Sequence, residues 1–448
     1  MKLVSSVSLA LVLALGSTVM LAPQSAVAAK KEKAPKAAAP TLSKEFRAAI
    51  APAQAAMQKK DVAAAEAALA VATPLAKLPD EIFFLGSIGY EVANAKNDKA
   101  GIRKGIDMMV DSGSKIPTNL DKLNMASGQM AYQAGEYQKA IDRLTAADQQ
   151  GSKDINRLLL TAEAHFKLSQ WAQGLGVLNK AAEEQKASGQ AVPEDWYRRG
   201  VSVSLKSKNT ALITDWSHKL VRNNPSATNW RDALIIFRDS AKLDAKSQLD
   251  IARLMYETKS LAGERDFNDY AALAIEGKLP WEAEKAIQAG LDSGAVVKTS
   301  KPIQERLAEV KTMSPVETSA LMTDQKKALT TGTAVYALNV ANALISHGDN
   351  DKALEMLGVA EKRAGADLST VNMLRGIALA RLGRKDEAKA AFSAVTASPK
   401  AEIGSFWKLY LDLGAATAGL APAISHAGPA SVSPAERERP AEILTNGW

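Results

Sequence analysis

The strongest constraint on the fold is a pattern of small and large residues that recurs at a nearly constant spacing. It is clearest in residues 128–147, GQMAYQAGEYQKAIDRLTAA, where a Gly-Glu-Tyr corner separates two segments of helical periodicity. Residues of matching size follow in the same order 34 positions later: Ala162 for Gly128, Trp171 for Tyr137, Gly174 for Ala140, Leu178 for Leu144 and Ala181 for Ala147. The pattern indicates a repeated helix–turn–helix unit.

A second pair of matching segments lies near the C-terminus. There Gly348 matches Gly383, and Ala353 matches Ala388, each with an offset of 35 residues. Two separate regions with almost the same period predict an array of stacked helical hairpins. Unrelated hairpins in an ordinary globular domain are the alternative.

The spacing resembles that of the tetratricopeptide repeat, whose 34-residue unit is a pair of helices. The resemblance is clear for residues 120–185 and 333–400, and weaker for 185–295. In these hairpins small residues would let paired helices approach closely, large residues would fill the space between them, and Gly or polar residues would form the corners. The residues with these packing and turn roles are Gly128, Ala162, Ala341 and Gly376 on first helices, Ala140, Gly174, Ala353 and Ala388 on second helices, the large residues Tyr137, Leu144, Leu178, Leu357 and Phe392, and the corners Gly135, Ser169, Gly348 and Gly383.

The chain between its two ends is almost wholly helical in character. It is rich in Ala, Leu, Lys, Glu and Gln and has almost none of the alternation that is typical of strands. We therefore predict an all-α fold, an α-solenoid that forms a right-handed superhelix of eight or nine tetratricopeptide-like units. The period is lost over 296–332, which we interpret as an irregular helical linker between N-terminal repeats (44–295) and C-terminal repeats (333–425), dividing the solenoid into two sub-stacks.

The N-terminus has the pattern of a secretory signal peptide over residues 1–29. Lys2 precedes the apolar run Leu9–Leu15, and Ala26-Val27-Ala28 forms a small-x-small cleavage site, so we expect cleavage after Ala28 or Ala29. An uncleaved membrane anchor is the alternative. The Lys/Ala/Pro-rich segment 30–43 is predicted to be a disordered linker and 426–448 a disordered tail.

The composition argues against several classes of function. The chain has no cysteine, which excludes disulfides, thiolate metal sites and lipid attachment at a cleavage-site cysteine. Its net charge is +7, but Lys2 and the linker hold four of these charges, leaving +3 for residues 37–448. The body is therefore nearly balanced, and we predict no nucleic-acid partner. No later segment is long and apolar enough to predict stable membrane insertion after cleavage of the signal.

Residues with catalytic potential are few and scattered. The chain has four histidines, and only His218 has an acidic neighbour at helical spacing, Asp215, with no third metal ligand in sight. Glu163 beside Phe166 is the nearest candidate for a general acid. No phosphate loop, dinucleotide fingerprint or nucleophile motif is complete. We predict no catalytic residue, no cofactor and no metal site.

The first helices of the stacked hairpins are expected to line the concave face, which usually binds peptides or partner helices. The side chains expected to point into this face are Lys122, Gln129, Tyr132, Gln133, Glu163, Phe166, Lys167, Asn342 and Arg381. Family members that grip a terminal carboxylate use convergent Lys and Asn on this face. Met125 and Gln129 occupy those places here, which argues against that mode of binding.

These observations favour a non-enzymatic scaffold of the periplasm or exterior that binds an envelope protein or peptide. The block 196–294, with the turn Asn223-Asn224-Pro225-Ser226 and the unit GKLPWEAEKAIQAGLDSG, is also similar to exported bacterial repeat proteins that accompany TonB-type envelope systems. Two alternatives stay open at this point. One is an α-superhelical protein that binds or processes peptidoglycan or another carbohydrate, and the other is an assembly factor that polymerises through its end units.

Overall fold

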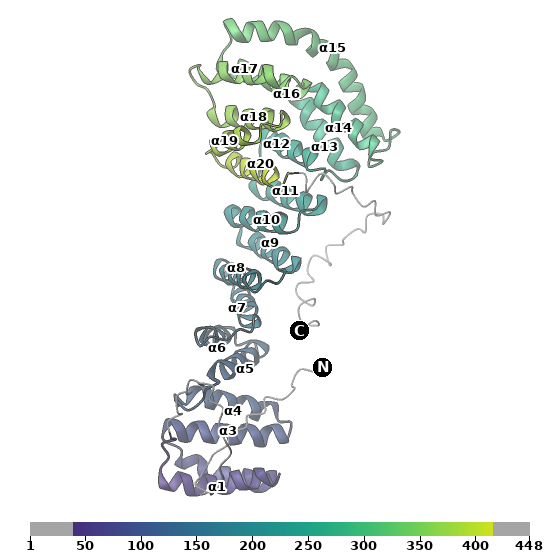
Figure 1. Ribbon diagram of the computed structural model, residues 1–448. Helices are drawn as coiled ribbons and strands as arrows, with labels where there is room; N and C mark the ends of the chain where they lie inside the picture. The colour runs from purple at the N-terminus through teal and green to yellow at the C-terminus, as the bar shows by residue number, and fades with distance from the viewer. Residues whose placement is uncertain (1–38, 415–448) are drawn as a thin grey trace, which may run out of the picture. The chain divides into compact units, whose positions relative to one another are not determined.

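The computed structural model describes residues 39–414 (Figure 1). All regular elements in this range are helices: α1 (Lys44–Gln58), α2 (Val62–Ala72), α3 (Pro79–Ala95), α4 (Lys99–Asp111), α5 (Leu120–Gln133), α6 (Tyr137–Gln149), α7 (Asn156–Lys167), α8 (Trp171–Ala187), α9 (Glu194–Ser207), α10 (Thr210–Asn223), α11 (Ala227–Ala241), α12 (Ala245–Glu257), α13 (Gly263–Glu276), α14 (Pro280–Asp292), α15 (Lys301–Thr330), α16 (Ala334–His347), α17 (Asn350–Glu361), α18 (Leu368–Arg381), α19 (Lys385–Ser393) and α20 (Lys400–Leu413), with a short 3₁₀ turn, η1 (Thr73–Leu75). The predicted signal peptide and tail, and most of the predicted linker, lie outside the described residues.

Most consecutive helices form antiparallel hairpins, which confirms the predicted all-α solenoid of tetratricopeptide-like repeats. The first and second helices of a hairpin touch where the sequence has small residues. A Cβ at Gly128 would lie 2.6 Å from Leu144 Cγ, and one at Gly376 only 2.4 Å from the ring of Phe392. The second-helix alanines Ala140, Ala353 and Ala388 are fully buried. Close helix approach therefore depends on these positions.

The corners between paired helices need a left-handed backbone. Gly348 ends α16 with φ of 105°, and its amide bonds to carbonyls of the last turn, as does the following amide of Asp349. Ser169 occupies the same kind of corner after α7 with φ of 58°. Glycine adopts this conformation without strain, yet residues with a Cβ also occupy it at other corners: Lys60, Asn97, Lys208, Lys242 and Lys278.

The chain divides into two compact units between Thr118 and Asn119. The sequence placed the division at 296–332 instead. That stretch holds one 30-residue helix, α15, which buries Ile303, Val310, Leu321 and Ala328 and packs against α13, α14, α16 and α17. It is thus an integral part of the second unit rather than a linker.

The first unit holds two hairpins, α1–α2 and α3–α4. A buried carboxylate, Glu81 on α3, fixes the entry of the chain into this unit by accepting hydrogen bonds from the amides of Ser43, Lys77 and Leu78 at 2.8–2.9 Å. Burial alone would raise the pKa of Glu81, but these bonds and one from the Ser43 hydroxyl outweigh it and lower the pKa to about 2.

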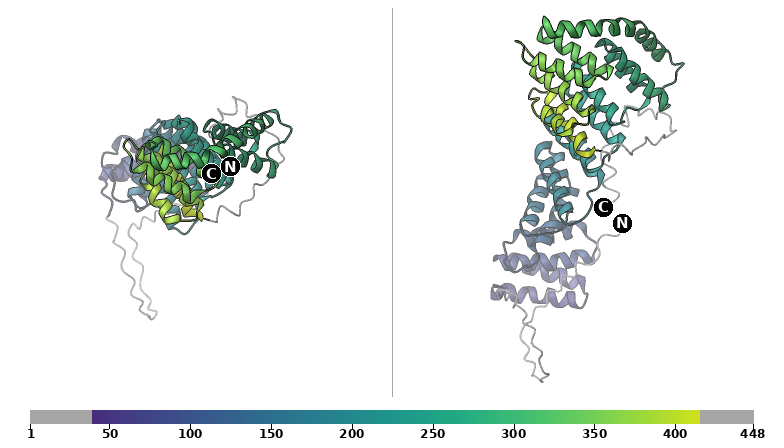
Figure 2. Two further views of the ribbon diagram at one scale, coloured as in Figure 1. Left: turned by 90° about the horizontal axis from the view of Figure 1, so that it is seen from above. Right: turned by 45° about the horizontal axis from the view of Figure 1, so that its top comes forward.

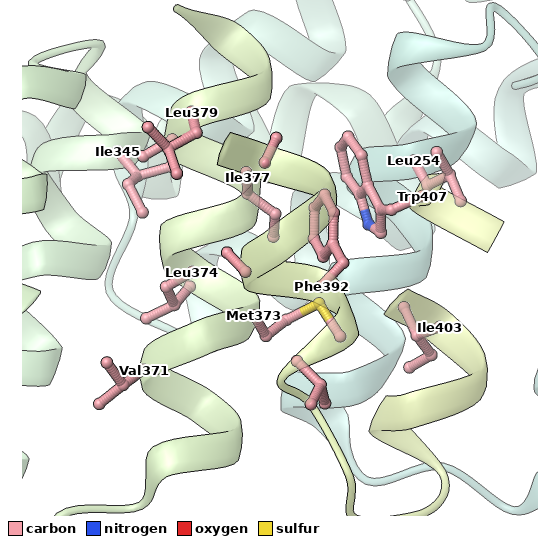
Figure 3. Close-up of a cluster of buried hydrophobic side chains, with 14 of the residues drawn as sticks. Leu254, Ile345, Val371, Met373, Leu374, Ile377, Leu379, Phe392, Ile403 and Trp407 are labelled. Carbon is pink, nitrogen blue, oxygen red and sulfur yellow. The ribbon is translucent and has the colours of Figure 1, made fainter. Parts of the chain in front are cut away.

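The second unit changes character after α10. Hairpins α5–α6, α7–α8 and α9–α10 stack in order, whereas α20 packs against α10, α12, α18 and α19, and α14 packs against α16. In Figure 2 the yellow C-terminal helices lie beside teal helices of the middle of the chain. One apolar core joins these distant segments, from Val221 to Leu411. In Figure 3 the rings of Phe392 and Trp407 lie side by side, with centroids 5.5 Å apart. The C-terminal helices therefore fold back onto the middle of the chain.

Among residues 39–414, no helix combines the length and apolar character needed to cross a membrane.

Candidate protein-binding surface

An exposed polar surface follows the first helices α5 and α7. Lys122, Gln129 and Gln133 on α5 and Lys167 on α7 are exposed. Tyr132, also on α5, is half-buried. We call these five residues the first-helix surface. They belong to successive hairpins, so the stack sets the spacing of their side chains.

Tyr132 is the aromatic centre of the first-helix surface. Its ring meets that of Tyr137 edge to face, with centroids 5.6 Å apart. Burial, followed by the negative charge of Glu163, raises the pKa of Tyr132 to about 12. The phenol therefore stays protonated near neutral pH and can donate a hydrogen bond to a ligand.

Glu163 is committed to an ion pair with the next hairpin. Its two carboxylate oxygens accept hydrogen bonds from Nε and Nη2 of Arg199 on α9 at 2.7 and 2.6 Å. A general acid needs a proton and a free oxygen directed at a substrate, whereas both oxygens here are occupied. The geometry thus gives no support to Glu163 as the acid of a carbohydrate-processing enzyme.

Phe166 does not belong to the exposed surface on which the sequence placed it. Its side chain is 4% exposed, and a Cβ at Gly174 would lie 2.3 Å from its ring. The ring fills the space that Gly174 leaves between α7 and α8, and the Arg199 guanidinium covers it at 5.3 Å. Phe166 is therefore a packing residue of its hairpin.

Asn342 and Arg381 are also not on an open face. The Asn342 side-chain oxygen accepts a hydrogen bond from Arg253 Nη2 at 2.8 Å, and Arg381 Nε donates to Glu257 at 3.0 Å. Both partners come from α12. Because the C-terminal helices return to the middle of the chain, positions that would line an open concave face instead meet another layer of helices.

These contacts belong to a buried polar cluster that the sequence analysis missed. At its centre Arg253 is 1% exposed and donates to both oxygens of Glu282 at 2.8 and 2.6 Å. Glu282 also accepts from the Tyr270 hydroxyl at 2.7 Å and lies 3.5 Å from Arg381. Burial alone would raise the pKa of Glu282, but these two arginines and the hydrogen bonds lower it to about 2. The cluster joins α12, α13, α14, α16 and α18.

Asp250 on α12 lies at the edge of the same cluster, and its pKa is shifted in the opposite direction to that of Glu282. Burial raises its pKa to about 6, even though Arg253 and Lys400 attract the charged form. Its contact with Arg253 Nη1 is long, 3.3 Å. The best hydrogen bonds of Arg253 go to Glu282, which leaves Asp250 with weaker compensation for its burial.

One pocket of about 400 Å³ opens between the starts of α12, α18 and α20. Its two carboxylates, Asp244 and Asp367, each cap the N-terminus of a helix, and Lys400 donates to Asp367 at 3.3 Å and to Thr370. The two carboxylates and Lys400 are thus engaged with groups of the protein itself.

The histidine that the sequence singled out has no metal-binding neighbours. Asp215 pairs with Lys219, and His218 bonds to Ser405 on α20. In the described part of the chain, no group of three or more His, Asp or Glu side chains could hold a metal ion.

Comparisons with known proteins return helical-repeat structures. No protein-family model matches the chain, and no curated protein matches it. The solved structures that are similar include the TPR2AB domain of yeast Sti1 in its pHSP90 complex, 15% identical, covering 62% of this chain and 90% of that chain with a TM-score of 0.23. A tetratricopeptide repeat protein from Parabacteroides merdae is 15% identical and covers 75% of this chain and all of its own, with a TM-score of 0.25. With superpositions this loose, the repeat class rests on the hairpins of the chain itself.

Proposed function

We propose that this chain is a non-enzymatic scaffold that binds another protein or a peptide through the first-helix surface of α5 and α7. The observation that carries the proposal is the contrast in exposure between equivalent positions. Lys122, Gln129 and Lys167 are open to solvent, while Asn342 and Arg381 are already engaged with α12. In the second unit, the first helices α5 and α7 thus offer exposed polar side chains at positions whose equivalents on α16 and α18 are engaged.

The chemistry of the surface supports a protein ligand. Amide groups of Gln129 and Gln133 can pair with a peptide backbone, and the protonated Tyr132 hydroxyl adds a donor on an amphipathic ring. Lysine side chains at both ends can contact carboxylates or carbonyl groups. Such adaptable polar contacts around an aromatic residue are common in protein interfaces.

Site-specific photocrosslinking tests this proposal. A photoreactive residue is placed at Gln129 or Gln133, and at Gln173 on the second helix α8 as an exposed, matched control. We expect discrete adducts from the first two positions that disappear when Tyr132 is replaced by Ala, and none from Gln173. Equal labelling at all three positions, or none at any of them under several growth conditions, would contradict the proposal.

We further propose that the protein acts in the periplasm or outside the cell and that its partner belongs to the envelope. The signal-peptide pattern of residues 1–29 supports this location. Fractionation of a Gram-negative host and sequencing of the mature N-terminus test it. The expected mature chain begins at Ala29 or Lys30, and a chain that keeps residues 1–29 would contradict the proposal.

A further inference from the structure

The last described helix, α20, closes the C-terminal part of the second unit. Its residues Ile403, Phe406 and Trp407 are fully buried. It packs against α18 and α19, its neighbours in sequence, and against α10 and α12, which precede it by more than a hundred residues. α20 is therefore one of the contacts between the C-terminal helices and the middle of the chain, beside the buried cluster around Arg253 and Glu282.

A histidine lies at the contact between α10 and α20. His218 Nε2 is 3.2 Å from Ser405 Oγ and hydrogen-bonded to it. The imidazole also meets the ring of Phe406 nearly at right angles, with centroids 4.4 Å apart, and Phe406 in turn lies 5.6 Å from Phe237. The imidazole thus packs as an apolar, neutral ring against the aromatic core.

The charged groups that act on His218 come from both helices and are mostly cationic. Arg222 on α10 and Lys408 on α20 disfavour a proton on the imidazole, whereas Asp215 on α10 favours one. Asp215, however, is engaged by Lys219 at 2.5 Å. A protonated His218 would therefore be a third cation beside Arg222 and Lys408.

A carboxylate near the end of α20 is also engaged by cations. Asp412 near the end of α20 accepts from Lys389 of α19 at 2.7 Å and lies 3.4 Å from Arg222. It therefore already balances two cations.

Burial, with the charge of Arg222 next in importance, lowers the pKa of His218 to about 4.

We propose that α20 is an acid-sensitive latch, in which a proton taken from solvent by His218 weakens the α10–α20 contact and releases α20 from the middle of the chain. A protonated imidazole loses its apolar packing on Phe406 and is repelled by Arg222 and Lys408. The released helix would uncover the aromatic cluster of Phe237, Phe392 and Trp407.

The direction in which pH affects the closure of α20 follows from the lowered pKa of His218. The released state has the ordinary histidine pKa, 6.5, and the closed state the lower one, about 4. Protons therefore bind the released state more tightly, so closure is fully favoured above pH 6.5 and is lost progressively as the pH falls toward 4. From this difference in pKa we expect the equilibrium constant for release of α20 to increase about 100-fold between pH 7 and pH 4.

Asp250 on α12 opposes this effect in the stability of the whole unit. Burial raises its pKa to about 6, so its protonation stabilises the folded unit as the pH falls toward 3.8. A global unfolding curve would mix the two contributions. The test must therefore compare variants at the same pH and observe α20 directly.

Hydrogen exchange with mass spectrometry on the full chain provides this test. Wild type and H218Q, whose side chain stays neutral, are compared at pH 7, 5.5 and 4, with residues 137–149 of α6 as the internal control. We expect peptides from 400–413 to lose about 100-fold more protection in wild type than in H218Q between pH 7 and pH 4. Equal losses in the two proteins, or full protection of α20 in wild type at pH 4, would overturn the proposal.

A second variant keeps the test decisive if H218Q does not fold. In K408Q one facing cation is removed while His218 remains, so the imidazole should titrate closer to pH 6.5 and α20 should open less on acidification. NMR titration of the four histidines of the chain reads this directly. A His218 resonance that already titrates near pH 6.5 in wild type would equally overturn the proposal.

Discussion

The second unit holds its helices together in two different ways. From α5 to α10, hairpins stack in order, small residues such as Gly200 permit close contact, and the ion pair Glu163–Arg199 keeps both side chains 17–20% exposed. From α12 to α20, distant helices meet around Arg253 and Glu282, which are 1–2% exposed. An open stack can leave the first-helix surface free for a partner, whereas in the closed region the equivalent residues form contacts with other helices of the same chain.

The largest expected effect comes from breaking the buried pair. We expect E282Q to lower the free energy of unfolding of the second unit by about 3–5 kcal/mol, because Arg253 and Arg381 would keep their buried charges without the anion that balances them. Urea denaturation followed by circular dichroism measures the change. The exposed pair Arg384–Glu387 supplies the control, and E387Q should leave the curve unchanged.

Replacing both partners sharpens this test. In R253M/E282L no buried charge of the central pair is left unbalanced, so much of the loss in E282Q should be recovered. The double variant still leaves Asp250 without Arg253 and Arg381 without Glu282, so we expect the recovery to be partial. A double variant that is less stable than E282Q alone would show that these contacts and the hydrogen bonds to Tyr270 and Asn342 outweigh the balance of charge in the central pair.

Most of the helices could be predicted from the sequence, because the signals that define a hairpin are local. The spacing of Gly128, Gly135 and Ala140 lies within one unit, and a matching set recurs 34 residues later. The closed region could not be predicted in this way. Arg381 meets Glu257 across 124 residues, and no feature of either hairpin specifies the other as its neighbour. Asn342 and Arg381 were therefore placed on an open face.

The same reasoning explains the mixed outcome for the candidate surface. Lys122, Gln129 and Gln133 are exposed on α5, as their register on a first helix predicts. Phe166 has the correct register for the same surface, but its size and the absence of a side chain at Gly174 draw the ring into the hairpin. Register alone does not decide between exposure and packing for a large apolar side chain.

Acid should affect the closed region through Glu282. Its pKa is about 2 in the folded protein against an ordinary 4.5, so its contribution to stability is fully present above pH 4.5 and is lost as the pH falls toward 2. The shift corresponds to about 3 kcal/mol. Urea midpoints of wild type and E282Q measured from pH 6 to pH 2.5 should converge at the acid end. Parallel curves would show that the charge of Glu282 is not the stabilising feature.

A smaller effect is expected from the close contacts of the open stack. A Cβ at Gly200 would lie 1.9 Å from the ring of Trp216, so G200A should destabilise the second unit by about 1–3 kcal/mol through overpacking. Gly176 on α8 has no atom within 4 Å of that position, and G176A should be neutral or stabilise by up to about 1 kcal/mol. Thermal unfolding of the two variants separates the effect of overpacking, which acts only in G200A, from the effect of helix propensity, which acts in both. Equal behaviour would mean that the helices of the open stack can shift apart without loss.

The smallest expected effect comes from the ion pair of the open stack, and it completes the comparison. E163Q removes the charge but keeps an amide beside Arg199, whose guanidinium still covers the Phe166 ring and still reaches water. We expect a loss of about 1 kcal/mol, decreasing further when salt is raised, because a partly exposed pair is screened and its arginine can be rehydrated. Urea denaturation at low and high salt, with E282Q measured alongside, gives the ratio of the two effects. If E163Q destabilised the unit as much as E282Q and were equally insensitive to salt, the ion pair of the open stack would be as desolvated as that of the closed region. This result would contradict the proposal that the first-helix surface is the part of the unit left free for a partner.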